Sequence, residues 1–511
     1  MTAQDRPTGG EGPVRLRPYQ EQAVAELRAL VRRGARRLLI AAATGSGKTT
    51  VAGHLICRAA SRGSRSLFLA HRRELINQAY GRLLQMGLPE AEVGVIMARD
   101  PRRRPGAHVQ VASIDTLRNR PKPRADVVFI DECHRALARS YRDLAARYPD
   151  AIHVGLTATP YRADGRGLGD MYDELVQVSS PRELIRLGYL VEPRVFTVPR
   201  DALPDLSGVR VRRGDYHESE LAEAVDRKHL VGNIVEHWLR HARDLRTVAF
   251  AVSVRHSQHI AEQFRQAGVP AEHLDGNTPL EERDAILGRL EAGVTRVVSN
   301  VGVLCEGWDQ PSVKCAILAR PTKSTGLYLQ QSGRILRPWE DLQAVILDHA
   351  GCALEHGLPQ DDRELTLDPA KKRRKGAAGV GPPLKTCEQC FAVVHTATRL
   401  CPECGFVFAP PQEVPEEASG DLVEVSATGL REKRDAWEKL CAVAARRGFK
   451  PGWAYHRYRE RFGAPPPATF ALEGKRPRRG TEVSVALREA VRGEGGRVSW
   501  DALADAAGER W

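Results

Sequence analysis

The stretch Ala43-Thr44-Gly45-Ser46-Gly47-Lys48-Thr49 decides the fold of this 511-residue chain. It follows the apolar run 37–43 and precedes an amphipathic stretch, so it joins a predicted strand to a predicted helix. Such a loop binds phosphate because backbone N–H groups and the helix N-terminus face the anion, while glycines let the backbone approach closely. We expect Lys48 to reach the β- and γ-phosphates of a nucleotide and the Thr49 hydroxyl to ligate Mg²⁺. The full pattern has glycine at position 42, where this chain has alanine.

A second polar cluster, Asp131-Glu132-Cys133-His134, ends the apolar run 127–130. Carboxylates at the carboxyl end of a parallel strand lie at the crevice where such sheets bind ligands. We expect Asp131 to hold Mg²⁺ and Glu132 to orient the attacking water. Without the phosphate loop upstream, such a pair would more often be a solvated strand end.

Length and composition limit the class of protein. At roughly 150 residues per domain, the length favours about three domains. Hydrophobic residues make up 42% and charged residues 28%, as in globular chains and unlike disordered or fibrous ones. We find neither an apolar run of the ~18 residues that a membrane span needs nor a signal peptide, so we expect a cytoplasmic protein without a membrane partner. The net charge of +13 favours a polyanionic partner, although arginine-rich composition alone produces such an excess.

From residue 14 to about 350, short apolar runs alternate with amphipathic stretches. This alternation is typical of parallel sheets with helices on both faces, and it occurs twice, which predicts two α/β domains in series. The predicted segments are a disordered N-terminus (1–13), the first α/β domain (14–198), a connector (199–225), the second α/β domain (226–360), a basic linker (361–384), a Cys-rich segment (385–409), a second linker (410–430) and a mostly helical C-terminal module (431–511).

Taken in order, the motifs of residues 14–350 resemble those of superfamily 2 helicases, the DEAD/DEAH-like ATPases, here with DECH at 131–134. The resemblance implies two tandem RecA-like P-loop domains that hydrolyse ATP with Mg²⁺, and a catalytic role for His134. Leu16–Gln20 is similar to the family's adenine-recognising element, which implies that Arg17 and Gln20 contact the nucleotide. Three further segments resemble the strand-binding motifs and the motif that couples hydrolysis to strand movement: 70–75, 112–117 and 157–160.

Two segments of the second domain extend this resemblance. Residues 299–311 are similar to the loop that contacts nucleic acid and nucleotide, which implies that Asp309 contacts ATP. Residues 330–337 fit QxxGRxxR, in which Gln330, Arg334 and Arg337 are implied to be catalytic. We expect both arginines on one helical face, because they are three residues apart, and within reach of the γ-phosphate only when the two domains close. An arginine supplied in this way is worth about 10³–10⁵ in rate.

The thiols of Cys387, Cys390, Cys401 and Cys404 form a CxxC…CPxCG pattern. Four thiolates from two tight knuckles favour a closed, tetrahedral Zn²⁺ site, and the metal would supply folding energy to a segment with little core. Unliganded thiols and an iron–sulfur cluster are the alternatives. Whether such a zinc ribbon binds nucleic acid, binds protein or only folds stays open.

The motor motifs, Arg-Pro-Thr-Lys-Ser at 320–324 and the trailing ribbon are together similar to RadD-like DNA-repair ATPases and related phage helicases. The resemblance implies an ATP-dependent DNA helicase or translocase in DNA repair or replication-fork processing. It also implies a contact with single-strand-binding protein, which we cannot assign to residues of this chain.

Other functions stay open. The motor subunit of a restriction system shares this motor class, and Glu473 and Lys475, with Asp435 upstream, weakly resemble a PD-ExK nuclease. An RNA helicase is compatible with the DECH motif, and a chain with an inactive motor would act only as a zinc-ribbon binding protein. The basic runs 102–104, 371–375 and 475–479 are either phosphate contacts or solvated tethers. The aromatic and cationic residues of 448–458 fit either a stacking surface for nucleic acid or a packed helix.

Overall fold

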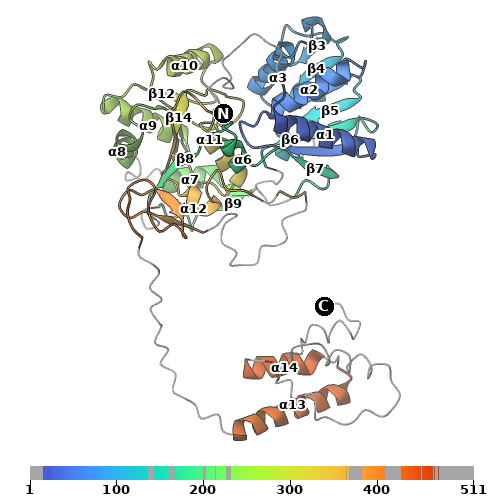
Figure 1. Ribbon diagram of the computed structural model, residues 1–511, viewed down its shortest axis with the longest axis vertical. Helices are drawn as coiled ribbons and strands as arrows, with labels where there is room; N and C mark the ends of the chain where they lie inside the picture. The colour runs from blue at the N-terminus through green and yellow to red at the C-terminus, as the bar shows by residue number, and fades with distance from the viewer. Residues whose placement is uncertain are drawn as a thin grey trace. The chain divides into compact units, whose positions relative to one another are not determined.

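The computed structural model describes residues 15–135, 143–159, 167–199, 203–212, 214–225, 232–363, 365–367, 383–408, 427–449, 452–463, 465–466 and 470. They belong to two compact units, residues 1–411 and 412–511. The first unit contains two lobes, drawn in blue and in green to yellow in Figure 1. The predicted N-terminal segment 1–13, the basic runs 371–375 and 475–479, and Glu473 and Lys475 lie outside the described residues.

The first lobe is built on a seven-stranded parallel sheet in the order β3-β4-β2-β5-β6-β1-β7. Consecutive residues of a strand point to opposite faces of the sheet and so pack in different apolar clusters. In β1, Leu38 and Ile40 pack on one face and Leu39 packs on the other. A sheet covered on both faces buries most positions of its strands, which explains why its central strands read as largely apolar runs. The strands are β1 (Arg37–Ala41), β2 (Ser66–Ala70), β3 (Val93–Ile96), β4 (Val109–Ser113), β5 (Val127–Ile130), β6 (Ile152–Thr157) and β7 (Glu174–Gln177).

The helices of this lobe follow the βαβ pattern, so the predicted parallel α/β fold is confirmed. The phosphate loop follows β1 and the acid pair follows β5, and since these strands are separated only by β6, both motifs reach the same edge of the sheet. The described helices are α1 (Pro18–Arg32), α2 (Lys48–Ala60), α3 (Arg73–Gln85), α4 (Ile114–Arg118) and α6 (Pro181–Arg186), with 3-10 turns η2 (Glu90–Glu92) and η3 (Cys133–Arg135).

The second lobe contains a six-stranded parallel sheet in the order β12-β13-β11-β14-β15-β8. Its strands are β8 (Pro193–Thr197), β11 (Arg246–Phe250), β12 (Ala271–Leu274), β13 (Val297–Asn300), β14 (Val313–Leu318) and β15 (Ala344–Asp348). Its helices are α8 (Gly232–His241), α9 (Val254–Gln266), α10 (Leu280–Ala292), α11 (Thr325–Gly333) and α12 (Cys352–His356).

The strand β8 corrects the predicted boundary between the domains. A first domain ending at residue 198 would include this strand, but β8 pairs in parallel with β15, from Pro193 opposite Ala344 to Thr197 opposite Asp348. The chain therefore enters the second sheet before it forms the connector. The pattern of residues within a segment can indicate a strand but not the strand with which it pairs. Here the partner lies 151 positions later in the chain, so the pairing depends on the tertiary fold.

The predicted connector carries structure of its own. It contains a short hairpin of β9 (Val211–Arg212) and β10 (Asp215–Tyr216), followed by α7 (Glu218–Val225). The Asp215 carboxylate accepts hydrogen bonds from the Thr322 hydroxyl at 2.9 Å and from the Lys323 backbone N–H at 2.8 Å. These bonds attach the hairpin to the loop that precedes α11.

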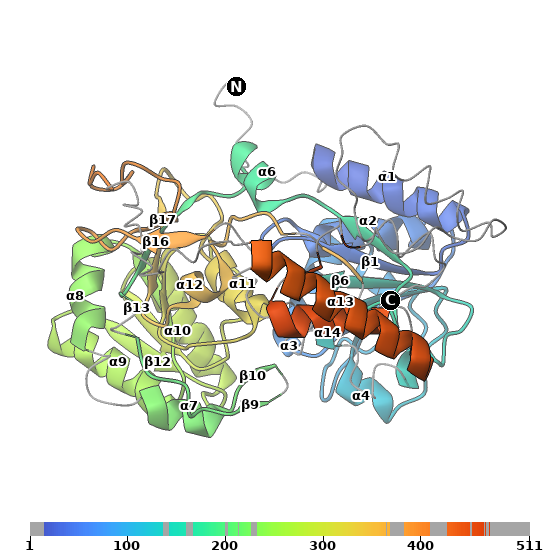
Figure 2. The same cartoon turned by 90° about the horizontal axis from the view of Figure 1, so that it is seen from below.

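The Cys-rich segment packs against the second sheet. Its antiparallel strands β16 (Leu384–Thr386) and β17 (Val393–His395) lie against the green lobe (Figure 2). The Thr197 N–H of β8 donates to the Phe391 carbonyl at 3.1 Å, and Phe196 forms an isolated bridge with Ala392. This Cys-rich segment, called the ribbon below, thus covers the edge of β8 that faces away from β15. That edge would otherwise expose unpaired backbone groups.

The second unit contains the helices α13 (Ala427–Arg447) and α14 (Gly452–Phe462), as the sequence predicted. Tyr458 is 1% exposed and lies edge-on to Trp437, with ring centroids 5.7 Å apart, so the packed-helix alternative holds for this residue. Phe449 is 40% exposed, and its ring centroid lies 4.8 Å from that of Trp453 in α14. None of the described helices combines the length and apolar composition required to cross a lipid bilayer.

Candidate active site

A cavity of about 390 Å³ lies where the two lobes of the first unit meet. Both lobes line it, and the predicted site residues among its walls are Thr44, Gly45, Gly47, Lys48, Thr49, Asp131, Glu132, Asp309, Gln330, Arg334 and Arg337. The structure therefore brings together side chains from the phosphate loop, the acid pair and the second-lobe motifs. Among the described residues, Arg17, Gln20, Ser46 and His134 were also predicted but lie outside this wall.

The phosphate loop is supported from behind by the first turn of α1. Gly47 has a left-handed backbone with φ of 86°, and a Cβ there would lie 2.4 Å from the Gln20 Nε2 atom. That amide donates to the Ser46 carbonyl at 2.8 Å, while Arg17 N–H donates to Gln20 Oε1 at 3.0 Å. The Gln20 side chain therefore fixes the phosphate loop by a hydrogen bond to the loop's backbone, at the Ser46 carbonyl.

Glu132 is the centre of the contacts in the cavity. Its Oε1 lies 3.1 Å from Lys48 Nζ, and its Oε2 accepts a hydrogen bond from Gln330 Nε2 of the second lobe at 3.4 Å. His134 Nδ1 lies 3.3 Å from the same Oε2 and 3.3 Å from the Thr157 hydroxyl. Glu132 also has a positive φ of 47°, which is rare for a non-glycine residue and often marks a functional site. One carboxylate thus connects the phosphate loop to the opposite lobe.

The two neighbouring carboxyl groups titrate differently. Burial, and then the adjacent charge of Glu132, raise the pKa of Asp131 above its usual range. Burial would also raise the pKa of Glu132, but the charge of Lys48 and the hydrogen bond to His134 outweigh it, and the pKa of Glu132 falls below its usual range. Glu132 is therefore ionised at neutral pH.

The two arginines of the second lobe do not share a helical face, so that prediction is wrong. Helix α11 ends at Gly333, and the chain continues through Arg337 without helix. The reason is that Arg334 occupies the C-cap, where its Nε and Nη2 atoms donate to the Cys305 carbonyl at 3.1 and 2.6 Å. Arg337 is instead paired with Asp309, and its Nε lies 3.5 Å from the position of a Cβ on Gly45. Arg337 is thus the arginine beside the phosphate loop.

The loop after β2, which resembles a strand-binding motif, contacts the second lobe. His71 Nε2 lies 2.7 Å from Glu306 Oε2, and Arg72 Nη1 donates to the Gly302 carbonyl at 3.1 Å. Gln78 of α3 donates to the Gly307 carbonyl at 2.6 Å. These contacts hold the two lobes together at one side of the cavity.

The sequence interpretation missed the polar face of α3. Gln78, Arg82 and Gln85 line the cavity from this helix. Their spacing of four and three residues places them on one helical face, away from the buried stripe of Ile76, Ala79, Tyr80 and Leu83. That periodicity was available as a signal, but a polar helix face is usually only solvated.

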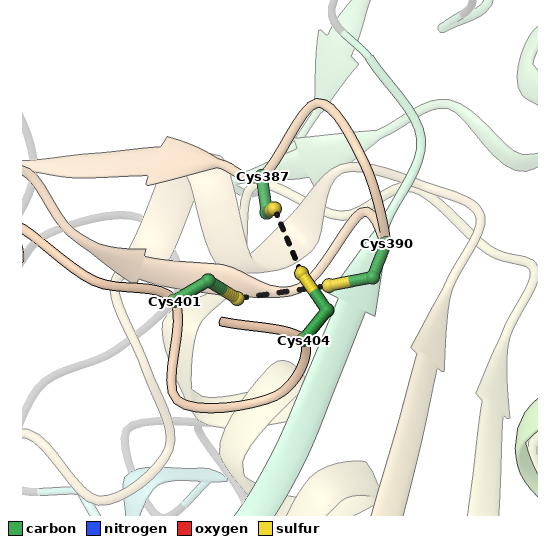
Figure 3. A group of neighbouring side chains, drawn as sticks. All are labelled: Cys387, Cys390, Cys401 and Cys404. Carbon is green, nitrogen blue, oxygen red and sulfur yellow. Dashed lines mark hydrogen bonds between the residues drawn. The ribbon is translucent and has the colours of Figure 1, made fainter. Parts of the chain in front are cut away.

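A second site lies in the ribbon, where the four cysteines converge (Figure 3). All four sulfur atoms lie within 4.8 Å of one another, and the Cys387–Cys404 and Cys390–Cys401 Sγ atoms are 3.7 Å apart. Tetrahedral coordination with Zn–S bonds of about 2.3 Å requires sulfur–sulfur distances of about 3.8 Å. The residues therefore fit a Zn²⁺ ion.

A phosphate loop and acid pair on one parallel sheet, with arginines presented by a second, define a two-domain P-loop NTPase motor. The type III restriction enzyme res subunit family matches residues 13–162, and the helicase conserved C-terminal domain family matches residues 229–338. The chain belongs to the superfamily 2 helicases and is an ATP-hydrolysing enzyme.

Individual relatives support this family. A 51.5 kDa protein of a Lactococcus phage is 30% identical over 77% of this chain and 84% of its own length. A Saccharomyces cerevisiae protein named as the ATP-dependent helicase IRC3 is 31% identical over 63% of this chain, which spans about half (49%) of that protein. A fragment of an HsdR subunit of a type I restriction enzyme from Vibrio vulnificus shares the fold, with a TM-score of 0.53 and 23% identity, covering 74% of this chain and 70% of the fragment.

Replacing Gly47 by alanine is expected to weaken ATP binding. The new Cβ would require a left-handed backbone and would displace Gln20, at a cost of about 1–3 kcal/mol. That cost corresponds to a roughly 5- to 150-fold loss of affinity in a nucleotide titration. Gly34→Ala is the matched control, because Gly34 also has a positive φ but no neighbour near its Cβ position. Equal affinities of the two variants would contradict the role of the loop.

Proposed function

We propose that this chain is an ATP-dependent DNA helicase or translocase that acts in DNA repair or replication-fork processing. The observation that carries the proposal is the continuous connection from Lys48 through Glu132 to Gln330, which spans the two lobes. Since the residues needed for hydrolysis come from both lobes, hydrolysis depends on their apposition. A strand bound across both lobes can control that apposition, which is how such a motor couples ATP to movement.

In the proposed mechanism, Lys48 changes its partner. Its ammonium pairs with Glu132 in the structure and would pair with the β- and γ-phosphates of bound ATP. Glu132 would then be released to orient the attacking water. Thr49 and Asp131 would hold Mg²⁺, which supplies positive charge against the developing negative charge of the phosphates. Arg337, beside Gly45, would stabilise the transition state from the second lobe.

One observation supports DNA as the polymer, which is that the first lobe matches a family of restriction enzyme subunits. The net charge of +13 suits a nucleic acid of either kind. We therefore expect single-stranded or forked DNA to raise the ATPase rate at least about tenfold, because strand binding favours the closed cleft. Steady-state ATPase assays with single-stranded, duplex and forked DNA and with RNA test this. Stimulation by RNA alone would contradict the assignment to DNA.

The restriction-system motor is the second candidate, because the family match over residues 13–162 is to a restriction enzyme subunit. The assay with duplex DNA distinguishes this candidate from a helicase or translocase. After incubation with Mg²⁺ and ATP, the duplex is recovered and its length is measured. Cleaved duplex would favour the restriction motor, whereas intact duplex with stimulated hydrolysis supports the helicase or translocase.

Variants of Lys48 and Glu132 should separate binding from hydrolysis. Lys48→Ala is expected to weaken ATP binding, because the ammonium contacts phosphates in the ground state. Glu132→Gln is expected to bind ATP at least as tightly as the unmodified protein, because the amide removes a charge that repels the γ-phosphate. Both should lower the hydrolysis rate by at least about 10²-fold. Nucleotide titration and steady-state assays measure this, and unchanged hydrolysis in both variants would refute the proposed site.

We also propose that the four cysteines bind one Zn²⁺ ion and that the ribbon stabilises the second lobe. Cys387 and Cys401 belong to the same apolar cluster as Phe196 and Trp238, so the metal site is continuous with the core of that lobe. Arg194 of β8 also pairs with Glu403, which lies between the last two cysteines. The ribbon is therefore attached to the motor through an apolar surface, an ion pair and the backbone of β8.

Removing zinc should destabilise the second lobe without abolishing ATP binding. The double variant Cys387→Ser, Cys390→Ser is expected to lose about one bound zinc per chain. It should also lower the thermal unfolding midpoint, while ATP affinity survives because the phosphate loop lies on the first lobe. Metal analysis, calorimetry and nucleotide titration test this, with Cys441→Ser of the second unit as the control that keeps its zinc. Zinc that persists without the two thiols would disprove the site.

A further inference from the structure

Lys314 lies in the interior of the second lobe, on the central strand β14. It is completely buried, between Val313 and Cys315, which are equally inaccessible to solvent. An ammonium removed from water is costly unless it is paired or fully hydrogen-bonded. A lysine at this position therefore requires a specific partner.

The partners of Lys314 are backbone carbonyls of the segment that carries Arg337. Its Nζ donates to the Ile335 carbonyl at 2.9 Å and to the Arg337 carbonyl at 2.6 Å. The carbonyl between them, of Leu336, accepts from the Val191 N–H at 2.8 Å. Because α11 has ended at Gly333, the carbonyls of these three residues have no helical N–H partner among the described hydrogen bonds, although the Leu336 N–H donates to the Gly333 carbonyl at 3.5 Å. The lysine and Val191 take the place of those bonds.

The chemistry of the ammonium suits this task. It offers three donors from one atom, so it can hold two carbonyls that are not adjacent in sequence, which an apolar residue of the same size cannot do. Among its described contacts there is no carboxylate, and burial lowers the pKa of Lys314 to about 8. Lys314 is thus a buried cation whose described hydrogen bonds are all donated to the segment 335–337, which carries Arg337.

We propose that Lys314 is a positioning residue for ATP hydrolysis. By fixing the carbonyl of Arg337, it sets the backbone from which the Arg337 side chain reaches Asp309 and the phosphate loop at Gly45. This inference rests on the proposed role of Arg337 in stabilising the transition state. It extends the active site into the core of the second lobe, to a residue that is fully buried.

The test compares Lys314→Met with Arg337→Ala and with the double variant. Since Arg337 acts in the transition state, Lys314→Met should lower kcat at least about tenfold and change KM for ATP by less than about twofold. In the Arg337→Ala background, Lys314→Met should cause no further loss, because it acts through that side chain. Lys385→Met is the matched control. The Lys385 ammonium also donates to a loop carbonyl, that of Thr398, but this loop lies in the ribbon. The kcat of the Lys385→Met variant should therefore be unchanged.

The outcomes separate this inference from the proposed function. If Arg337→Ala hydrolyses ATP normally, the proposed function of Arg337 fails first. If Arg337→Ala is inactive while Lys314→Met keeps its kcat, or if the two losses multiply in the double variant, the inference about Lys314 is overturned. Should Lys314→Met not fold, Lys314→Gln retains a donor in similar volume. A folded Lys314→Gln whose loss of kcat multiplies with the loss caused by Arg337→Ala would equally overturn the inference.

Discussion

The ion pair between Lys48 and Glu132 is the contact around which the first unit is organised. It joins the loop after β1 to the acid pair after β5, and Glu132 passes the connection to Gln330 in the second lobe. The parallel arrangement makes this possible, because strands that run in one direction end at the same edge of the sheet. The left-handed backbones of Gly47 and Glu132 are local costs that this convergence imposes.

The second lobe depends on a different constraint. Backbone groups at the edge of its sheet and in its irregular segments need hydrogen-bond partners from elsewhere in the chain. The edge of β8 is covered by the cysteine-rich ribbon, and the segment after α11 is held by Lys314 and Val191. In both places, backbone groups that regular secondary structure leaves unpaired are satisfied by a distant part of the chain. We infer that the ribbon and the buried lysine belong to the motor itself, since each fixes a part of the lobe that carries Arg334 and Arg337.

Much of the fold was predictable because both sheets are covered on both faces. Most of their strands are largely apolar runs, and the alternation with helices indicated the parallel α/β architecture directly. The predicted residues of the phosphate loop, the acid pair and the arginine motif line one cavity. The helical face shared by Arg334 and Arg337 was wrong, because spacing alone does not show where a helix ends. Lys314 was missed because one lysine in an apolar strand carries no pattern.

The sequence by itself determined the class of motor and indicated the helices α13 and α14. It also predicted the residues that would hold phosphate, Mg²⁺ and Zn²⁺. These features depend on residue type at short spacing, which is local information. Only the tertiary structure decided that β8 belongs to the second sheet, that the ribbon pairs with its edge, and that Arg337 lies beside Gly45 of the phosphate loop. Each of these depends on contacts between residues far apart in the chain, where many pairings satisfy the same local pattern and packing of the whole lobe selects one.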